Sequence, residues 1–302
     1  MIALVPEAFS ALVSGRDPEP FISGDDWLAG LPRLVTESLT EWELTLDGGA
    51  MHGACALVLP VRRRDDLPAV LKIAWPHREA EHEHLALQHW GGRGAVRLLA
   101  ANPGRWTMLL ERLNGRRDLS DVPVDAACRV IGDLLRQLDH VALPQLSRLS
   151  AVCARLVERL DSAPPAVPRR FVDQARALLS DLMTDDAVDS RMVHTDLHYE
   201  NVLAADRQPW LAIDPKPLAA DPAFAVAPAL WNRWEEAVAT GDIRRHLRRR
   251  LSIICEVAGL DEERARAWSI VREVQMASWA VKDDDADEVT KAVAIIKAMQ
   301  PD

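Results

Sequence analysis

The spacing of apolar residues changes near residue 124, and this change divides the chain into two parts. Before it, apolar side chains alternate with polar ones, as at Trp42, Leu44 and Leu46, or form short runs such as ACALVLPV and AVLKI. Such patterns, bounded by Gly and Pro, are typical of β-strands. We therefore predict mainly strands and turns in the first part, with one helix over 77–90. Further strands are predicted at 69–73, 96–100 and 106–110.

From Val124 onwards, apolar residues recur at every third or fourth position, as at Ala127, Ile131 and Leu134. This spacing predicts amphipathic helices that pack one face into a core. A strand-rich part followed by a helix-rich part indicates an α+β fold. We place the domain boundary after residue 113. Further helices are predicted over 146–160, 168–183, 242–258, 261–281 and 286–299.

The composition of the chain indicates which kinds of ligand and partner it can bind. The 302 residues carry a net charge of −10, which argues against nucleic acid and favours a cationic ligand. The basic stretch RRHLRRR at 244–250 is interpreted as a solvated helix face. No run reaches the roughly 18 apolar residues of a membrane helix, and the N-terminus lacks a basic signal-peptide region. Four widely spaced cysteines without a C-x-x-C pair indicate free thiols in a reducing cytoplasm.

Most of the chemical information lies in two neighbouring segments, VHTDLHYENVL at 193–203 and WLAIDPK at 210–216. They place Asp196, Asn201 and Asp214 between short apolar runs. Phosphoryl transfer needs an acceptor for the hydroxyl proton and oxygen ligands for a divalent metal. Two other interpretations stay open at this point. The loop is a polar turn that caps its own backbone, or His194, Asp196 and His198 bind metal in a hydrolase.

The motifs together resemble the aminoglycoside phosphotransferases, in the branch that contains the streptomycin 6-kinases and the hydroxyurea phosphotransferases. The resemblance implies a two-lobe protein-kinase-like fold, with a nucleotide-binding N-lobe over 1–113 and a catalytic and acceptor-binding C-lobe over 114–302. The motifs that carry it are GGRGAVRLLA at 91–100, LLERL at 109–113, HxDLHxENVL at 194–203, WLAIDPKP at 210–217 and ALWNRW at 229–234.

The resemblance implies roles for the C-lobe residues. Asp196 would orient and deprotonate the acceptor hydroxyl, while Asn201 and Asp214 would bind magnesium. Lys216, next to the metal-binding Asp214, would steady the transferring phosphate, unless it only forms a structural ion pair. Thr195 stands where the family commonly has glycine.

In the N-lobe, Lys72 would bind the α- and β-phosphates of the nucleotide. Glu83 is the expected ion-pair partner, and Glu79 is the alternative. The glycine-containing hairpin tip, including Gly49, would cover the phosphates with backbone N–H groups. The adenine edge would be held by the backbone of Glu111 and Leu113.

Acceptor recognition has weaker signals. A cationic aminoglycoside needs carboxylates around its amines, and Trp231, Trp234 and Trp279 offer aromatic walls for a sugar. Ala225 stands where the branch usually has an aspartate that braces the catalytic loop. The candidate acceptor residues are the carboxylates Asp221, Glu235, Asp283 and Asp284.

These inferences predict a cytoplasmic enzyme that transfers a phosphoryl group from ATP or GTP, with Mg²⁺, to a hydroxyl of a small cationic molecule. Streptomycin is the leading acceptor, and antibiotic resistance is the implied role. Alternative acceptors are hydroxyurea, another antibiotic or a hydroxylated metabolite. A non-catalytic pseudokinase that only binds nucleotide is a further alternative. Neither nucleic acid nor a membrane is expected as a partner, and protein partners are unknown.

Overall fold

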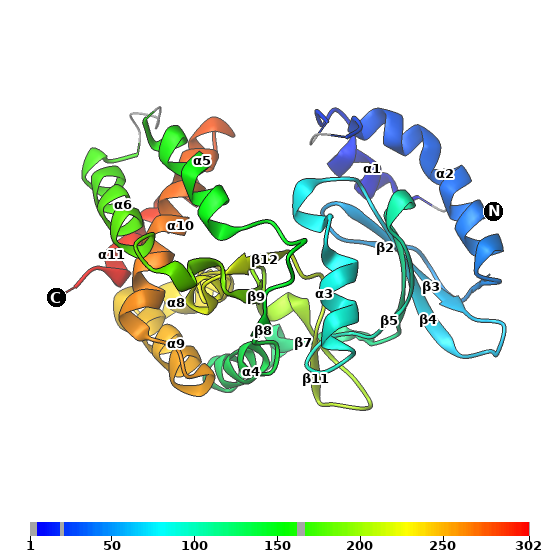
Figure 1. The fold of residues 1–302 in the computed structure, drawn as a ribbon. Coiled ribbons are helices and arrows are strands. Elements are labelled where there is room, and N and C mark those ends of the chain that lie inside the picture. The colour runs from blue at the N-terminus through cyan, green and yellow to red at the C-terminus, as the bar shows by residue number, and fades with distance from the viewer. Residues whose placement is uncertain (1–4, 19–20, 162–166, 302) are drawn as a thin grey trace. The chain divides into compact units, whose positions relative to one another are not determined.

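The computed structural model describes residues 5–18, 21–161 and 167–301. The chain forms two compact units, Met1–Asn114 and Gly115–Asp302. The first is rich in sheet and the second is mainly helical, so the predicted α+β class is confirmed (Figure 1).

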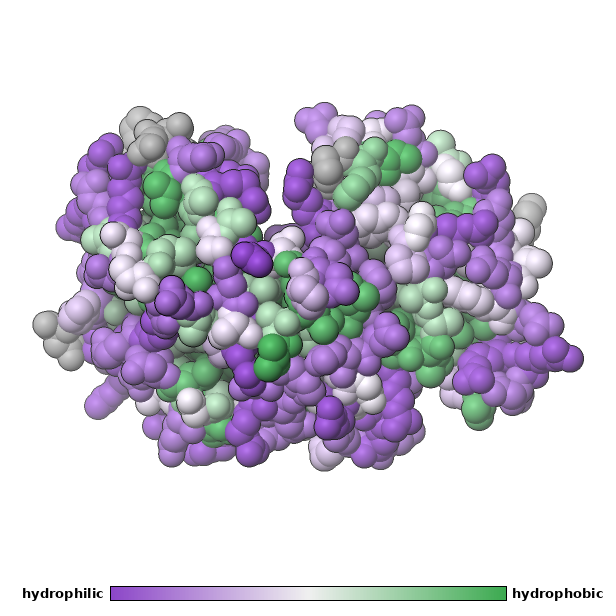
Figure 2. All heavy atoms as spheres, viewed as in Figure 1, coloured by the Kyte–Doolittle hydropathy of each residue, from purple (hydrophilic) through white to green (hydrophobic). Residues whose placement is uncertain are grey.

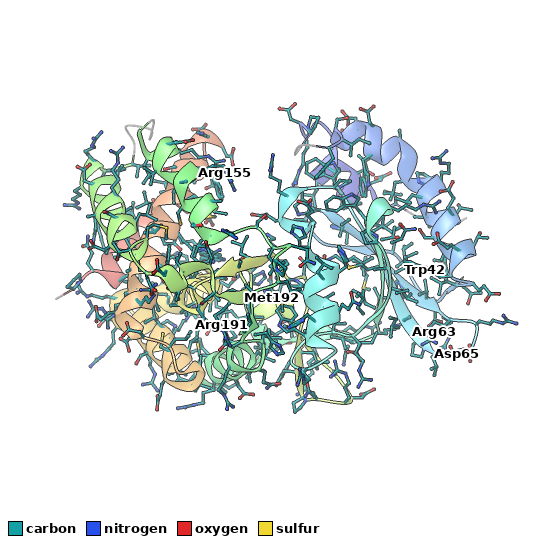
Figure 3. The ribbon with its side chains drawn as sticks, in the orientation of Figure 1. Trp42, Arg63, Asp65, Arg155, Arg191 and Met192 are labelled. Carbon is teal, nitrogen blue, oxygen red and sulfur yellow. The ribbon has the colours of Figure 1, made fainter. Side chains whose placement is uncertain are left out.

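An antiparallel sheet forms the centre of the first unit. Its strands follow the order β1-β3-β4-β6-β5, and β2 pairs with β3. The β3–β4 hairpin places Lys72 opposite Val58, and Figure 3 marks Arg63 and Asp65 at its turn. Most side chains of β3 are buried, including Leu57 and Leu59, which is typical of a strand within the core of a sheet rather than at its edge. The strands are β1 Thr45–Leu46, β2 Met51–His52, β3 Ala56–Arg62, β4 Pro68–Ala74, β5 Leu98–Asn102 and β6 Thr107–Glu111.

The prediction that the first part is mainly strands overlooked two helices, α1 Glu7–Val13 and α2 Gly24–Glu41. Ser23 caps α2 by accepting a hydrogen bond from the Asp26 N–H, and the helix tolerates Pro32 in its interior. Its buried positions include Trp27, Leu31 and Val35, which join the core that the sheet forms. The four-residue spacing of these apolar side chains is the signal that predicts this helix.

The helix predicted over 77–90 is shorter than expected. A 3-10 turn, η1 (Arg78–Ala80), comes first, and the α-helix α3 runs from Glu83 to Trp90. Gly91 ends α3 with a left-handed φ of 58°, a conformation that glycine adopts without steric cost. Glu83 therefore occupies the first turn of α3, where the helix dipole favours a carboxylate.

Helices dominate the second unit, and those predicted from the 3.6-residue period are present with shifts of a few residues. Buried apolar side chains lie along one face of each, as the pattern predicted. The helices are α4 Val124–Gln137, α5 Leu149–Asp161, α6 Arg169–Leu182, α7 Pro228–Trp231, α8 Trp234–Ala239, α9 Ile243–Ala258, α10 Glu262–Lys282 and α11 Ala286–Met299. Short 3-10 turns are η2 Pro103–Arg105, η3 Leu119–Asp121, η4 Asp186–Asp189, η5 Tyr199–Asn201 and η6 Pro222–Ala225.

Two small sheets lie among these helices, in the orders β11-β10-β7 and β12-β9-β8. In β9, Met192 is buried, whereas Arg191 is half-buried and donates to the Asp139 carboxylate at 2.6 Å; Figure 3 labels Arg191 and Met192. The strands are β7 Asn114–Asp118, β8 His140–Val141, β9 Arg191–His194, β10 Val202–Ala204, β11 Trp210–Ala212 and β12 Pro217–Ala220.

The basic stretch on α9 is only in part the solvated face that we predicted, because Arg244, Arg245 and Arg249 are exposed whereas other members are not. Arg250 is only 1% exposed and donates to the carbonyl oxygens of Asn232 and Arg233. Arg248 donates from Nε to the Ala298 carbonyl at 2.8 Å. The stretch therefore supplies internal hydrogen bonds within the second unit.

Polar side chains cover most of the face shown in Figure 2, with smaller apolar areas between them. Within the described residues, none of the helices combines the length and apolar character that crossing a bilayer requires.

Candidate active site

Two strand pairings bring the two informative segments together. In the β9–β12 pair His194 lies opposite Pro217, and in the β10–β11 pair Val202 lies opposite Ala212. The loop between β9 and β10 must therefore run beside the loop between β11 and β12. The sheet register thus places Asp196 and Asn201 next to Asp214 and Lys216.

His194 links the two loops from a buried position. Its Nε2 lies 3.0 Å from the Ile213 carbonyl oxygen, and its Nδ1 accepts from the Asp196 N–H at 3.2 Å. Because a carbonyl only accepts, Nε2 must carry the proton. Burial lowers the pKa of His194 to about 4, so the ring is neutral near pH 7. The histidine therefore positions the backbone of Asp196 rather than accepting the substrate proton.

The Asp196 carboxylate is 18% exposed, and its Oδ2 lies 3.1 Å from Lys216 Nζ. Asn201 Nδ2 donates to the Asp196 carbonyl oxygen at 2.9 Å. Three residues predicted separately from two motifs thus meet within the second unit. A partly exposed carboxylate beside a cation and an amide is suited to accept a proton from a hydroxyl.

Asn201 and Asp214 provide oxygen donors that fit a magnesium ion. The Ile213 N–H donates to the Asn201 carbonyl at 2.9 Å, which brings the next residue, Asp214, close to Asn201. Asp214 has a φ of 54°, a left-handed conformation that turns the chain sharply after β11. The Asn201 side-chain nitrogen faces Asp196, which leaves its amide oxygen for a cation. Carboxylate and amide oxygens are ligands that Mg²⁺ accepts.

The hydrolase interpretation finds no support in the geometry. No group of three or more His, Cys, Asp or Glu side chains is placed to hold a metal ion in the part of the chain that the structure describes. Both ring nitrogens of His194 already face backbone groups. His198 Nδ1 is buried and lies 4.0 Å from Glu200 Oε2, and none of the residues that the structure describes forms a hydrogen bond with it.

Two residues that the sequence did not assign hold the catalytic loop. The Thr195 hydroxyl donates to the Lys216 carbonyl at 2.7 Å, so the threonine in the usual glycine position connects the two loops. Arg272 on α10 donates to the Thr195 carbonyl. The signal for Arg272 is a charged pair, Arg272-Glu273, set among the apolar residues Ile270, Val271 and Val274.

The first unit contains a buried ion pair between Lys72 on β4 and Glu83 on α3. Lys72 Nζ lies 2.6 and 2.7 Å from the two Glu83 oxygens. Glu79, the alternative partner, lies in η1 and is exposed. The pair holds the lysine extended within the sheet, as binding to a nucleotide phosphate requires.

The remaining N-lobe candidates are backbone positions. Gly49 is exposed in the link between β1 and β2, and a Cβ added there would meet no atom within 4 Å. The Glu111 N–H already donates to the Arg97 carbonyl at 3.0 Å, so a contact with adenine at Glu111 must use its carbonyl oxygen. Leu113 follows the end of β6 and is half-buried.

Comparison with known proteins resolves the identity of the fold. The family model "Aminoglycoside/hydroxyurea antibiotic resistance kinase" matches residues 41–284. The chain belongs to this kinase family. A streptomycin 6-kinase of Streptomyces glaucescens is 42% identical over 98% of this chain and 97% of its own length. A hydroxyurea phosphotransferase of Kitasatospora aureofaciens is 40% identical over 92% of this chain and 81% of its own length.

The structural comparison confirms the kinase-like fold. Amicoumacin kinase superimposes with a TM-score of 0.59 at 14% identity, covering 89% of this chain and 92% of its own. The resemblance stated from the motifs is therefore confirmed, as is the enzyme class of a small-molecule phosphotransferase. A kinase of this family uses a nucleotide as its phosphoryl donor.

The four acceptor candidates of this antibiotic resistance kinase fall into two groups. Asp221 is 5% exposed, and its carboxylate accepts from Arg264 Nε, from Trp268 Nε1 and from the Ala223 N–H. These bonds give Asp221 a structural part. The other three carboxylates are exposed: Glu235, Asp283 and Asp284.

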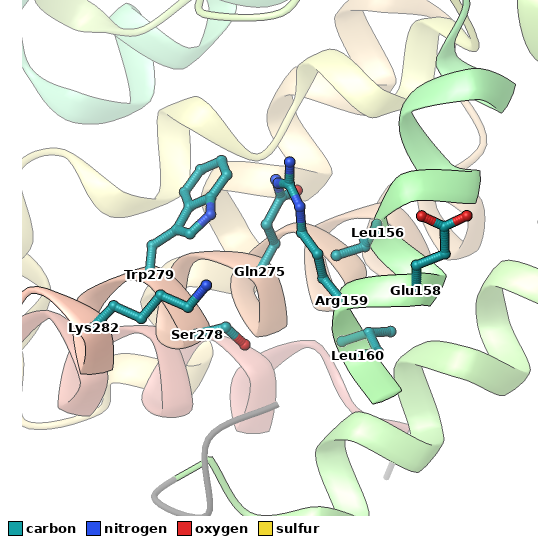
Figure 4. Close-up of a pocket in the computed structure, with 8 residues that line it drawn as sticks. All are labelled: Leu156, Glu158, Arg159, Leu160, Gln275, Ser278, Trp279 and Lys282. Atoms are coloured by element: carbon teal, nitrogen blue, oxygen red, sulfur yellow. The ribbon is translucent and has the colours of Figure 1, made fainter. Parts of the chain in front are cut away.

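A groove of about 270 Å³ lies between α5 and α10 of the kinase (Figure 4). Trp279, one of the predicted sugar-stacking residues, is 38% exposed in its wall. Arg159 and Lys282 bring two cationic side chains to the same groove, and Figure 4 shows both directed toward Trp279 and Gln275. Asp283 and Asp284 follow Lys282 at the end of α10. The groove thus has an indole ring in its wall and both cationic and acidic side chains at or near its edge.

Proposed function

We propose that this kinase transfers the γ-phosphoryl group of ATP, with Mg²⁺, to a hydroxyl group of streptomycin or a closely related aminoglycoside, and so inactivates the antibiotic. The observation that carries the proposal is the Asp196 carboxylate held beside Lys216 and Asn201. The near full-length similarity to a streptomycin 6-kinase supports the choice of acceptor. Because the donor is intracellular ATP, we place the enzyme in the cytoplasm.

In the proposed mechanism, Asp196 accepts the proton of the acceptor hydroxyl as the hydroxyl oxygen forms a bond to the γ-phosphorus. The bond between the γ-phosphorus and the oxygen that bridges it to the β-phosphate breaks in the same transfer, and ADP leaves. Neutral His194 keeps the backbone of Asp196 in place without adding a second base. Lys216 steadies the negative charge of the transferring phosphoryl group, since its ammonium lies 3.1 Å from the carboxylate that meets the hydroxyl. Lys72, held by Glu83, binds the α- and β-phosphates.

Magnesium would be held by the Asn201 amide oxygen and the Asp214 carboxylate, and when bound it would neutralise charge on the nucleotide phosphates. The left-handed φ of 54° at Asp214, which turns the chain sharply after β11, supports this assignment.

For the acceptor, we propose recognition by the exposed carboxylates Glu235, Asp283 and Asp284, with Trp279 providing a flat surface for a sugar ring. Carboxylates bind guanidinium groups in a bidentate manner, and streptomycin carries such cations. The overall charge of −10 would further attract a polycation.

Hydroxyurea is the second candidate acceptor, because the hydroxyurea phosphotransferase is almost as similar as the streptomycin kinase. Hydroxyurea is small and neutral, so it would gain little from the exposed carboxylates. The two candidate acceptors can therefore be distinguished by replacing the acidic residues of the second unit. The replacements should raise KM for streptomycin and leave KM for hydroxyurea unchanged.

The experiment measures the release of the nucleoside diphosphate, ADP or GDP, and identifies the phosphorylated product by mass spectrometry. The purified protein is given ATP or GTP, Mg²⁺, and streptomycin, hydroxyurea, other antibiotics or small hydroxylated metabolites. We expect phosphorylated streptomycin, with ATP as the better donor. Turnover of hydroxyurea alone selects the second candidate, and nucleotide binding without any product supports the pseudokinase.

A further inference from the structure

The carbonyl oxygen of Thr195, one residue before Asp196, is held by an arginine far along the chain. Both terminal nitrogens of Arg272 on α10 lie 3.0 Å from this oxygen. Its Nη1 also lies 3.0 Å from the Phe224 carbonyl in η6. Hydrogen bonds from a charged donor are stronger than those between neutral groups. Arg272 therefore joins α10, η6 and the loop that carries Asp196.

Aromatic rings hold the plane of this guanidinium. Its central carbon lies 4.5 Å from the centre of the Phe224 ring and 5.1 Å from that of Trp231. The Phe224 ring is packed edge-to-face against Trp268, also on α10, at 5.3 Å. A planar guanidinium stacks on aromatic faces in a way that the ammonium of a lysine cannot reproduce. The direction in which Arg272 donates is thus fixed by its surroundings.

Thr195 is held from a second direction by the other loop of the site. Its hydroxyl donates to the Lys216 carbonyl at 2.7 Å, and the next N–H, that of Asp196, donates to His194 Nδ1. Ala225, the residue after Phe224, is buried and has no polar side-chain group. The guanidinium of Arg272 thus contacts the Thr195 carbonyl from α10, whereas Ala225 offers this peptide no polar side chain.

We propose that Arg272 is a positioning residue for phosphoryl transfer. By fixing the peptide carbonyl that precedes Asp196, it sets the direction in which the carboxylate meets the acceptor hydroxyl. It acts through Thr195 and not on the substrate. The inference rests on the proposed function, because it assumes that Asp196 receives the proton.

The test compares Arg272→Met, which keeps the aliphatic length and removes the donors, with Arg266→Met on the same helix. Arg266 pairs with Glu262 and Glu263 of α10 and is the matched control. For Arg272→Met we expect kcat to fall on the order of 10- to 100-fold, with KM for ATP within about twofold of wild type. Arg272→Lys should recover part of the lost kcat.

Hydrogen–deuterium exchange over residues 192–203 gives a second readout. Exchange of the catalytic-loop amides should be faster in Arg272→Met and unchanged in Arg266→Met. All rates are normalised to the concentration of nucleotide-binding sites, so that a loss of folded protein does not count as a loss of kcat.

Unchanged kcat in Arg272→Met, or unchanged loop exchange, would overturn the inference. A fall in thermal stability with normal kcat per binding site would also overturn it, since that result describes a purely structural residue. If the wild-type protein phosphorylates no acceptor, the proposed function fails. The exchange comparison then decides the Arg272 inference separately, and unchanged exchange rejects it.

Discussion

The two units each contain a lysine–carboxylate pair, and the two pairs differ in burial. In the first unit, the side chains of Lys72 and Glu83 are 8% and 2% exposed, and the ammonium contacts both carboxylate oxygens. In the second, the side chains of Lys216 and Asp196 are 35% and 18% exposed, with a contact of 3.1 Å to Oδ2.

The difference in burial indicates different parts in the reaction. Removing one member of a buried pair leaves an uncompensated charge and destabilises a protein by about 3–5 kcal/mol. A partly exposed pair is worth about 0–1 kcal/mol and exchanges partners at little cost. We therefore interpret the Lys72–Glu83 pair as part of the folded framework, and we expect Lys216 to exchange Asp196 for the phosphoryl group in the proposed mechanism.

Replacing Lys72 should have the largest effect. Lys72→Met leaves the buried Glu83 carboxylate without its cation, so unfolding free energy should fall by about 3–5 kcal/mol. The proposed phosphate contact of Lys72 would be lost as well, so kcat/KM for ATP should fall on the order of 100-fold or more. Urea titration and steady-state kinetics measure the two effects.

The double variant Lys72→Met/Glu83→Leu separates them. Removing the orphaned carboxylate should restore much of the stability, while kcat/KM for ATP stays low. Recovery of activity together with stability would show that Lys72 has only a structural role.

Glu273 on α10 sharpens the comparison, because among the described residues no salt bridge joins this buried carboxyl group to a cation. It is 2% exposed, its Oε1 has no hydrogen-bond partner in the same part of the chain, and burial raises its pKa from 4.5 to about 8. Between these pH values the folded chain keeps a proton that the unfolded chain releases, so this group makes stability fall as pH rises. Glu273→Gln should therefore add about 2–4 kcal/mol to the unfolding free energy at pH 8.

Urea denaturation of wild type and Glu273→Gln between pH 5 and 8 checks this expectation. The gain in unfolding free energy should shrink toward pH 5, because the unfolded chain then also begins to bind the proton that the folded chain already holds. The kcat of the enzyme should not change. A gain that is independent of pH would contradict the assignment of a buried, protonated carboxyl group.

Lys216→Met should have a smaller effect, confined to catalysis. We expect kcat to fall about 10- to 100-fold because the transferring phosphoryl group loses a cation. Unfolding free energy should change by less than about 1 kcal/mol because the pair is partly exposed. Lys216→Arg serves as the charge-preserving control. A large loss of stability with little loss of kcat would reverse the contrast between the two pairs.

Gly49→Ala should have the smallest effect. A Cβ at Gly49 meets no protein atom within 4 Å, so stability should not fall. If this backbone approaches the phosphates, the added methyl should raise KM for ATP about threefold. Gly30→Ala, in α2 with equally open space, is the control and should leave KM unchanged. An unchanged KM in Gly49→Ala would remove this position from the nucleotide site.

The helices of the second unit could be predicted from the sequence because a buried face repeats every 3.6 residues. The expected spans 242–258 and 286–299 differ from α9 and α11 by no more than one residue at either end. In contrast, α2 was overlooked, since Pro32 and several polar residues conceal its apolar face. Local periodicity decides such predictions, so an interrupted pattern weakens them.

The residues of the candidate site also fall into those that local sequence patterns predict and those that they do not. Asp196, Asn201 and Asp214 stand in motifs whose strands pair locally, so their proximity follows from the sequence order. Asp221 accepts from Trp268 of α10, and Arg272 of α10 donates to Thr195, so both act through contacts between residues far apart in sequence. Such tertiary contacts leave no periodic signal. For this reason Asp221 was expected at the acceptor and Arg272 was not expected at all.

The central claim, that Asp196 accepts the proton in phosphoryl transfer, is tested most directly by Asp196→Asn. This change keeps the side-chain shape and removes the base. The rate of streptomycin phosphorylation and the dissociation constant for Mg²⁺–ATP should be measured on the same preparation. The account predicts a loss in kcat of about 10²–10⁴-fold with ATP affinity nearly unchanged. Transfer by Asp196→Asn at a rate near that of wild type would contradict it.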